Sequence, residues 1–274
     1  MKTILTGKTG LIGSHIKSFF DHKNHELTTF GRNDCDYYLD LNNFDLSKEK
    51  EKLADTVIHC AGVTDEEIST NLESSIKKNT LGLVKFVDWS LQAGVKRFIY
   101  ISSAHVYGNL NQNIDEKTEL IPKSLYANLH IFAENYIRSN IENVTIIRPN
   151  AVFGKVGTNF NRWGLIPFSF PKSLFQENKI TIKSHGKQQL NFVSADTIAA
   201  TVYESLSDSI FGVINPVGYH TMSVLDFAKY CIKTINQSYE KDFGLEVLSK
   251  EDYTSNFKYS SSKVNCKELS TKLN

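Results

Sequence analysis

Two segments of the chain carry side chains of the kinds that transfer protons in enzymes. Ser103 stands in ISSAHVYG, residues 101–108, and Tyr126 and His130 stand in YANLH about twenty residues later. A spacing of four residues places the phenol and the imidazole on one face of a helix. A serine at a strand end is also common as a cap, and a tyrosine and a histidine on one helix face also serve as packing residues. Convergence of all three beside a bound nicotinamide would make a proton-transfer site.

A glycine-rich turn near the start of the chain predicts where that nicotinamide dinucleotide would bind. Gly7, Gly10 and Gly13 follow a short apolar run in KTILTGKTGLIG, at the spacing GxxGxxG. The first glycine permits a tight turn, the second lets backbone N–H groups approach a pyrophosphate, and the third lets helix and strand pack closely. The same spacing also occurs in a plain strand-to-helix turn.

The elements that position these groups alternate between strands and helices. Hydrophobic periodicity predicts strands at 25–30, 56–60, 97–101 and 144–147, and helices at about 11–20, 66–93 and 126–139. This alternation predicts a parallel sheet with crossover connections. After residue 148 proline, glycine and aromatic residues crowd together without a clean period, and later elements are expected at 180–182, 190–193, 196–206 and 222–234.

The fold class that follows is α/β, with a Rossmann-type doubly wound parallel sheet and a small C-terminal substrate-binding lobe. We expect residues 1–150 to form the dinucleotide-binding domain, with strand contributions from about 190–215, and residues 151–274 to form mainly the lobe.

Composition excludes several other classes of protein. A net charge of +1 over 274 residues argues against a nucleic-acid partner. The chain has no run of roughly 18 apolar residues and no signal-peptide pattern, so we expect no membrane partner and a cytoplasmic location. Its four cysteines lack CxxC spacing, which predicts neither a metal site nor a disulfide framework.

Six motifs in fixed order carry a resemblance to a known family: GKTGLIG, VIHCAG, Asn79, ISSAHVYG, YANLHIFAE and IRPNAVFG. The ordered set covers roughly residues 1–235 and resembles the extended short-chain dehydrogenase/reductase superfamily, in its NAD-dependent epimerase/dehydratase branch acting on nucleotide sugars. The resemblance implies a Rossmann domain that holds NAD or NADP and a homodimer formed through the helices at about 66–93 and 123–139.

The resemblance also implies roles for individual residues. Tyr126 would be the general acid and base, Ser103 would bind the same substrate oxygen, and His130 would complete the catalytic set. The residues implied for cofactor binding are Gly7, Lys8, Thr9, Gly10, Leu11, Ile12, Gly13, Arg32, Asp40, Leu41, Cys60, Ala61, Gly62, Asn79 and His130. Those expected to bind substrate are Ser103, His105, Asn150, Asn159, Arg162 and Trp163.

The chain departs from the family's YxxxK motif, because His130 stands where the family has lysine. That lysine bonds the nicotinamide ribose and its charge lowers the pKa of the tyrosine. An imidazole of ordinary pKa is largely uncharged at neutral pH, although it can still bond a ribose hydroxyl. The departure leaves two hypotheses: an enzyme with a differently tuned site, or a protein that binds the dinucleotide as a sensor or scaffold without turnover.

A second departure concerns the substrate. Leu190 stands where nucleotide-sugar enzymes often carry an arginine for the diphosphate, so Lys155, Arg162 or Lys187 would bind it instead, or the substrate is not a nucleotide sugar. Trp163 could stack on a sugar ring or close the core. The family's dehydratases place an Asp-Glu pair where Ala104 and His105 stand here, which disfavours dehydration.

The choice of cofactor is predicted from a few charged residues near the glycine turn. Arg32 precedes Asp34 after the second strand, and Lys8 adds a cation in the glycine loop, so NADP is favoured over NAD. The function predicted first is an NAD(P)-dependent ketosugar reductase, with a nucleotide-sugar epimerase as the alternative.

Overall fold

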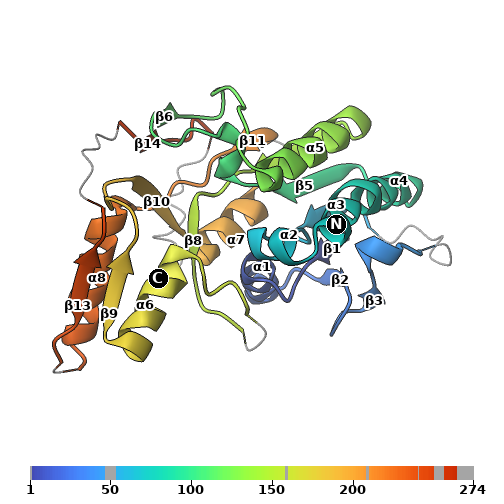
Figure 1. The fold of residues 1–274 in the computed structure, drawn as a ribbon. Helices are drawn as coiled ribbons and strands as arrows, with labels where there is room; N and C mark the ends of the chain where they lie inside the picture. The colour runs from blue at the N-terminus through green and yellow to red at the C-terminus, as the bar shows by residue number, and fades with distance from the viewer. Residues whose placement is uncertain are drawn as a thin grey trace.

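The computed structural model describes residues 2–46, 54–157, 160–207, 210–239, 241–249 and 256–263. Its central feature is a 7-stranded sheet in the order β11-β7-β5-β4-β1-β2-β3 (Figure 1), and each neighbouring pair is parallel. The strands are β1 (Thr3–Thr6), β2 (Leu27–Gly31), β3 (Tyr37–Tyr38), β4 (Thr56–His59), β5 (Arg97–Ile101), β7 (Asn143–Ile147) and β11 (Gly212–Ile214). The chain reverses direction across the sheet between β1 and β4, which is where open α/β folds bind ligands. The predicted doubly wound parallel sheet is confirmed.

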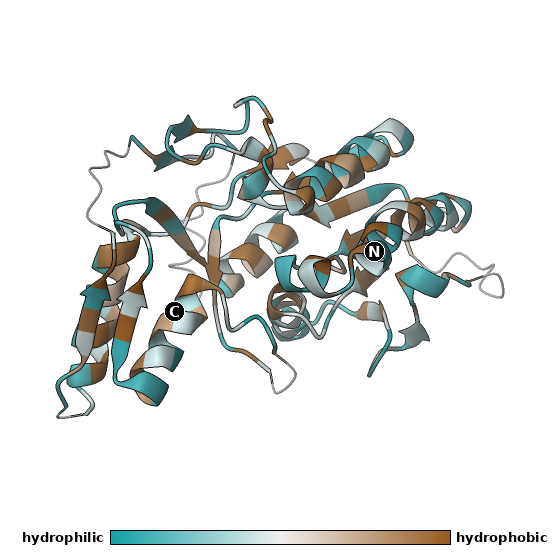
Figure 2. Ribbon diagram, in the orientation of Figure 1, coloured by the Kyte–Doolittle hydropathy of each residue, from teal (hydrophilic) through white to brown (hydrophobic). Residues whose placement is uncertain are grey.

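Helices cover both faces of this sheet (Figure 1), namely α4 (Leu83–Gln92) and α5 (Leu125–Asn140) on one and α1 (Leu11–His22) and α7 (Ala195–Glu204) on the other. Neighbouring residues of one strand serve opposite faces: Val57 packs with Phe86 of α4, whereas Ile58 packs with Ile16 of α1. The alternation follows from the period of two along a strand. Both faces are therefore apolar, and Figure 2 shows the central strands as mainly hydrophobic.

The C-terminal half adds smaller units beside the sheet. A 3-stranded sheet joins β8 (Ala151–Phe153), β10 (Gln189–Ser194) and β12 (His220–Ser223). Next to it, β9 (Lys179–Ile182) pairs with β13 (Gly244–Val247), and residues of both strands pack with those of α6 (Ile166–Glu177) and α8 (Val224–Asn236) in a separate core. A short pair of β6 (Asn113–Ile114) and β14 (Lys258–Tyr259) lies at the upper left of Figure 1, on the side of the N-terminal end of α5.

The helix predicted over 66–93 is wrong as a single element. The structure divides it into α2 (Asp65–Thr70), α3 (Leu72–Lys77), a π-helical turn (Lys78–Gly82) and α4. Asn71 breaks the run with φ −146 and ψ 81, and its side chain accepts a hydrogen bond from the Ser74 N–H to start α3. Gly82 packs so closely on Leu41 that an added Cβ would lie 2.1 Å from the Leu41 carbonyl oxygen. Tertiary contact therefore shapes this segment in a way that periodicity does not reveal.

The segment after residue 148, which has no clear hydrophobic period, contains the helix α6, which the sequence analysis did not predict. Its sequence begins with Pro167 in the first turn, where a missing N–H costs nothing, and it tolerates Pro171 in its interior. Phe168, Phe170 and Leu174 are its buried residues. Two prolines within five residues suggest a loop by composition, whereas the buried apolar face holds the segment as a helix.

A buried ion pair joins helix α5 to the end of β7. The Arg148 Nε donates to the Glu134 Oε1 at 3.0 Å, and the two side chains are only 2% and 1% exposed. Ser102, just after β5, donates to the same carboxylate at 2.6 Å, and the Arg148 guanidinium lies 5.0 Å from the centre of the Tyr107 ring. Because a buried charge is stable only when it is paired and hydrogen-bonded, this cluster fixes α5 relative to two strand ends.

Replacing Glu134 with alanine is expected to lower the free energy of unfolding by about 3–5 kcal/mol, because Arg148 would stay buried without its counter-charge. Urea denaturation followed by circular dichroism measures the loss. The matched control is Asp21→Ala, which removes an exposed pair with Lys17 on α1 and should cost under about 0.5 kcal/mol. Equal losses in the two variants would contradict the structural role of the buried pair.

Candidate active site

The glycine turn after β1 forms a cradle of backbone that no side chain could share. Gly7 has φ +74, and an added Cβ would lie 2.7 Å from the Ala61 nitrogen. A Cβ on Gly13 would lie 2.1 Å from the Gly7 carbonyl oxygen, and the Gly10 N–H donates to that oxygen at 3.0 Å. Thr9, Leu11 and Ile12 complete the turn into α1, whose first N–H groups point toward it. The geometry suits an anion such as a pyrophosphate at the positive end of the helix.

Further predicted cofactor residues lie along the same edge of the sheet. Cys60, Ala61 and Gly62 directly follow β4, and the Asn79 Oδ1 lies 3.8 Å from where a Cβ of Gly62 would stand. Asn79 belongs to the π-helical turn, and its Nδ2 donates to the Ser75 carbonyl at 2.8 Å. The Asn79 amide oxygen therefore lies toward the loop that follows β4.

The end of β2 carries the groups predicted to choose between NAD and NADP. Lys8 Nζ lies 3.2 Å from Asp34 Oδ2, so the two residues are paired across the glycine loop. Arg32 is exposed. Asp40 caps the short 3-10 helix Leu41–Asn43 by accepting from the Asn42 N–H at 2.9 Å, and Leu41 is buried in the core. The structure therefore gives Asp40 and Leu41 structural roles of their own at the edge of the site.

Ser103 and Tyr126 come together where β5 meets the start of α5. Ser103 caps the 3-10 helix Ala104–Tyr107, its oxygen accepting from the His105 N–H at 3.2 Å, so the capping interpretation is correct as far as it goes. Hydrogen bonding to the same hydroxyl acts to lower the pKa of the Tyr126 phenol. The serine therefore both ends the strand and contacts the predicted acid–base group.

Opposing influences act on the Tyr126 phenol. Removal from water is the largest, and it raises the pKa of Tyr126 above its usual value. The positive charge of Arg162 and hydrogen bonds from Ser103 and Arg162 lower that pKa, while the negative charge of Asp65 raises it. The positive charge that acts on the phenol thus comes from the segment between β8 and α6, and the negative charge comes from helix α2.

His130 lies one turn beyond Tyr126, and the two ring centres are 4.6 Å apart. Its Nδ1 is 2.7 Å from the Tyr100 hydroxyl, whereas its buried Nε2 has no hydrogen-bond partner among the described residues. Burial lowers the pKa of His130 to about 3, so the imidazole is neutral. When Tyr100 donates to Nδ1, Nε2 carries the ring proton and is left as a donor without an acceptor. An orphaned buried donor of this kind fits a ribose hydroxyl.

Some of the residues predicted to bind substrate lie near the Tyr126 phenol, and others make hydrogen bonds elsewhere in the protein. The His105 ring centre lies 5.9 Å from that of Tyr126, and the positive charge of Arg162 acts to lower the pKa of the same phenol. Asn150 instead accepts from the Asn191 N–H at 3.2 Å, and the Trp163 indole N–H donates to the Phe160 carbonyl at 3.0 Å. Asn159 lies outside the described residues. The substrate role predicted for all six residues, namely Ser103, His105, Asn150, Asn159, Arg162 and Trp163, stays a prediction.

Sequence reasoning missed two residues that support the site. Glu134 lies eight residues after Tyr126 on the same face of α5. Helical spacing was therefore the signal that could have shown that Glu134 faces the sheet. Tyr100 lies within the fully buried strand β5, and nothing in its sequence, RFIYI, marks Tyr100 as the partner of His130.

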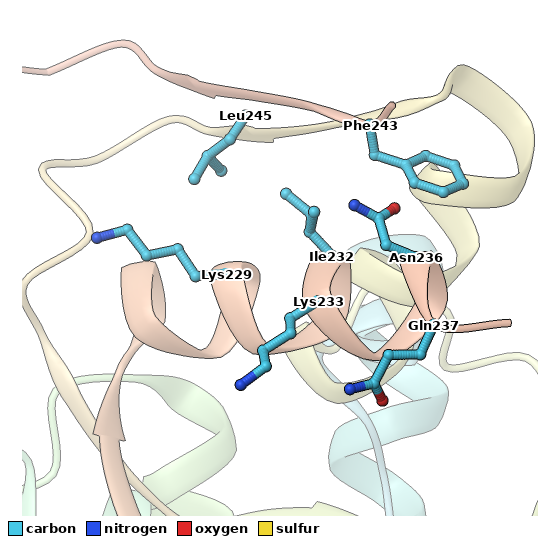
Figure 3. A pocket seen from close by; sticks show the side chains of 7 residues that line it. All are labelled: Lys229, Ile232, Lys233, Asn236, Gln237, Phe243 and Leu245. Carbon is cyan, nitrogen blue, oxygen red and sulfur yellow. The ribbon is translucent and has the colours of Figure 1, made fainter. Parts of the chain in front are cut away.

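A surface groove lies apart from these residues, between α8 and β13. Figure 3 shows Ile232 and Asn236 on the side of α8 that faces Leu245 and Phe243. Its lining includes no residue of the predicted site. Within the described ranges, no helix is both long and apolar enough to cross a membrane, and no group of three acidic, histidine or cysteine side chains is placed to hold a metal.

Known proteins resemble this chain in sequence and in fold. A dTDP-D-glucose 4,6-dehydratase of Mus musculus is 27% identical, over 93% of this chain and 78% of its own length. One of Dictyostelium discoideum is 28% identical, over 84% of this chain but 61% of its own length. Among solved structures, the UDP-N-acetylglucosamine 4-epimerase of Methanobrevibacter ruminantium M1 has a TM-score of 0.76 and 22% identity, covering 98% of this chain and 91% of its own. A dTDP-4-dehydrorhamnose reductase of Bacillus anthracis has a TM-score of 0.74 and 19% identity, covering 98% and 93%.

The two solved structures share the fold of the whole described molecule, from the glycine loop to the C-terminal lobe. The family model for the NAD dependent epimerase/dehydratase family matches residues 3–215, which include the glycine loop, Ser103, Tyr126 and strand β11. The family predicted from the order of the motifs is thereby confirmed: this chain belongs to the NAD dependent epimerase/dehydratase family.

Proposed function

We propose that the chain is an NAD(P)-dependent enzyme that transfers hydride at a ring carbon of a nucleotide-linked sugar, with reduction of a ketosugar favoured over epimerisation. The observation that carries the proposal is the meeting of Tyr126 and Ser103 beside His130, whose buried Nε2 has no hydrogen-bond partner within the described chain. Support for a nucleotide-sugar substrate comes from the relatives, which are named as a dehydratase, an epimerase and a reductase of such sugars.

The dinucleotide fits the residues that surround this edge of the sheet. The glycine cradle would hold its pyrophosphate, and the His130 Nε2–H would donate to the nicotinamide ribose. When bound, the nicotinamide supplies or accepts the hydride. A hydrogen bond from neutral His130 would orient that ring without adding charge beside it.

The protein's own groups would handle the substrate oxygen. In the reductive direction Tyr126 gives its proton to the carbonyl oxygen, and the Ser103 hydroxyl donates to the same oxygen and stabilises its developing charge. In the reverse direction the Tyr126 oxygen takes the proton of the alcohol. His105 lies beside the phenol and can bond a neighbouring sugar hydroxyl.

The residues after Ser103 bear on which reaction of the family is performed. The family resemblance places an Asp-Glu pair there in dehydratases, and this chain has a fully buried Ala104 followed by His105. Ala104 has no group that moves a proton, so water elimination is disfavoured even though the relatives of Mus musculus and Dictyostelium discoideum are named as dehydratases. A protein that binds the dinucleotide without turnover is the second candidate, favoured by the neutral His130.

Replacing Tyr126 with phenylalanine is expected to lower kcat at least about 100-fold, because the substrate oxygen loses its proton donor. The measurement is oxidation of NADPH or NADH in the presence of a panel of 4-keto nucleotide sugars, with cofactor affinity expected to stay within about twofold. Tyr136→Phe is the matched control, since Tyr136 lies on the same helix as Tyr126 but its hydroxyl donates to Asp88 of α4. Turnover near that of the unmodified protein in the Tyr126 variant would refute the acid–base role.

A preference for NADP is part of the same proposal and depends on Arg32. Nicotinamide fluorescence should show tighter binding of NADPH than of NADH, and Arg32→Ala should weaken NADPH at least about tenfold while leaving NADH within about twofold. Arg138→Ala, at the last turn of α5, controls for general loss of positive charge. Tighter binding of NADH by the unmodified protein would establish NAD as the cofactor instead.

A homodimer through α3 and α5 is proposed because apolar side chains remain exposed there. Leu72, Ile76 and Phe132 are 52%, 38% and 38% exposed. Light scattering after size exclusion should give twice the 31.0 kDa chain mass, and Phe132→Glu should reduce it to one chain. Leu248→Glu, on the exposed edge of the lobe, should leave the mass unchanged. A single-chain mass for the unmodified protein would exclude this interface.

A further inference from the structure

The described residues 256–263 form a segment that we call the C-terminal strap. Its strand β14 pairs in parallel with β6 (Figure 1), and the Ser260 N–H and hydroxyl both donate to the Ile114 carbonyl, at 3.0 and 3.1 Å. The Lys263 Nζ donates to the Phe211 carbonyl at 2.6 Å, just before β11. The strap is therefore bonded to two segments that lie far from it in the sequence.

The strap packs against the 3-10 helix that follows β5. Its two aromatic residues are nearly fully buried and share an apolar cluster with this helix and with β6. The cluster consists of Phe257, Tyr259, Ala104, Val106, Tyr107 and Ile114. His105 of the same helix instead has its ring centre 5.9 Å from that of Tyr126. The short helix therefore places some of its side chains against the strap and another beside the phenol.

The Glu116 carboxylate binds the strap and the end of β11 together. Its Oε2 accepts from the Ser262 N–H at 3.0 Å and from the Ser262 hydroxyl at 3.1 Å, and its Oε1 accepts from the Ser261 hydroxyl. The Asn215 N–H, directly after β11, donates to the same Oε1 at 3.2 Å. Since each carboxylate oxygen accepts from a backbone N–H, a neutral amide in the place of Glu116 could not satisfy both.

The Asn215 side chain connects this carboxylate to the 3-10 helix. Asn215 is fully buried, its Oδ1 accepts from the Tyr107 hydroxyl at 2.9 Å, and its Nδ2 donates to the Ser260 carbonyl at 3.2 Å. Tyr107 is the last residue of the helix that Ser103 caps. Asn215 therefore bonds the strap and the far end of this helix at once.

The near end of the same helix is held by the backbone that follows β7. The Ala104 N–H donates to the Pro149 carbonyl at 2.9 Å, and the Tyr259 hydroxyl of the strap donates to the adjacent Arg148 carbonyl. A 3-10 helix of four residues has few hydrogen bonds of its own, and their geometry is poor. Its position therefore depends on these contacts from outside, and the strap takes part at both ends.

We propose that the C-terminal strap is a positioning element of the active site, and that Glu116 and Asn215 are the positioning residues through which it holds Ser103 and His105 beside Tyr126. The proposal rests on the proposed function, in which Ser103 and Tyr126 handle the substrate oxygen. Neither Glu116 nor Asn215 reacts with substrate. Each acts through the 3-10 helix, because a displacement of about 1 Å at a group that bonds the reacting oxygen can cost about 100-fold in rate.

Hydrogen exchange followed by mass spectrometry tests this connection on the full chain, without cofactor or substrate. Glu116→Gln should raise the exchange rate at least about tenfold in residues 256–263 and in residues 101–108, because the amide cannot accept from both backbone N–H groups. Glu119→Gln is the matched control, since Glu119 is an exposed carboxylate three residues further along the same loop. It should leave exchange in both segments unchanged.

Tyr107→Phe separates the two connections. It removes only the hydroxyl that bonds the Asn215 Oδ1, so exchange should rise in residues 101–108 and stay unchanged in the strap. No rise in residues 101–108 in Glu116→Gln would overturn the proposal, and no rise there in Tyr107→Phe would overturn the role of Asn215. An equal rise in α1, whose buried residues belong to a different core, would also overturn the proposal, because it would show a general loss of stability.

Kinetics separate positioning from cofactor binding. Glu116→Gln should lower kcat for ketosugar reduction at least about tenfold, while the dissociation constants of NADPH and NADH stay within about twofold, because the glycine cradle follows a different strand, β1. An unchanged kcat would overturn the positioning role, and so would a parallel loss of cofactor binding. If the unmodified protein turns over no sugar while the exchange results hold, the proposed reaction fails and the strap's hold on the 3-10 helix stands.

Discussion

The buried ion pair of Arg148 and Glu134 is the constraint on which the geometry of the site depends. Arg148 directly follows β7, Glu134 lies two turns beyond Tyr126 on α5, and Ser102 at the end of β5 donates to the same carboxylate. A salt bridge in a low-dielectric core tolerates little displacement, since any separation exposes two charges to an apolar surrounding. The pair therefore fixes α5 along its axis and about it, and with it the direction of Tyr126 and His130.

The same constraint explains why a serine pair at a strand end has two distinct tasks. Ser102 turns its hydroxyl inward to Glu134, whereas Ser103, one residue later, turns outward to Tyr126. Adjacent residues of an extended segment face opposite sides, so one serine bonds helix α5 through Glu134 and the next faces Tyr126, the predicted acid–base group. Two consecutive serines thus serve separate purposes, Ser102 in holding the helix and Ser103 in the candidate site.

Much of the fold follows from patterns that a single sequence shows. The strand at residues 97–101 has its predicted limits because a buried run between a helix cap and polar residues has clear ends, and the glycine spacing located the cradle because only glycine fits there. The break at Asn71 and the helix containing Pro171 were not predictable, since each depends on packing partners distant in the chain. In the candidate site, spacing singled out Ser103, Tyr126 and His130, whereas nothing in the buried strand RFIYI marked Tyr100 as the hydrogen-bond partner of His130.

Because His130 is neutral, the position one turn beyond Tyr126 on α5 carries no positive charge. A cation on α5 would be fixed by the same ion pair that fixes the phenol, and its effect would be present in every state of the protein. An imidazole held neutral by burial removes that permanent charge, and its Nδ1 bond to Tyr100 keeps the ring from turning. At its Nε2 the ring can therefore offer a ligand a hydrogen bond, whereas it offers no positive charge.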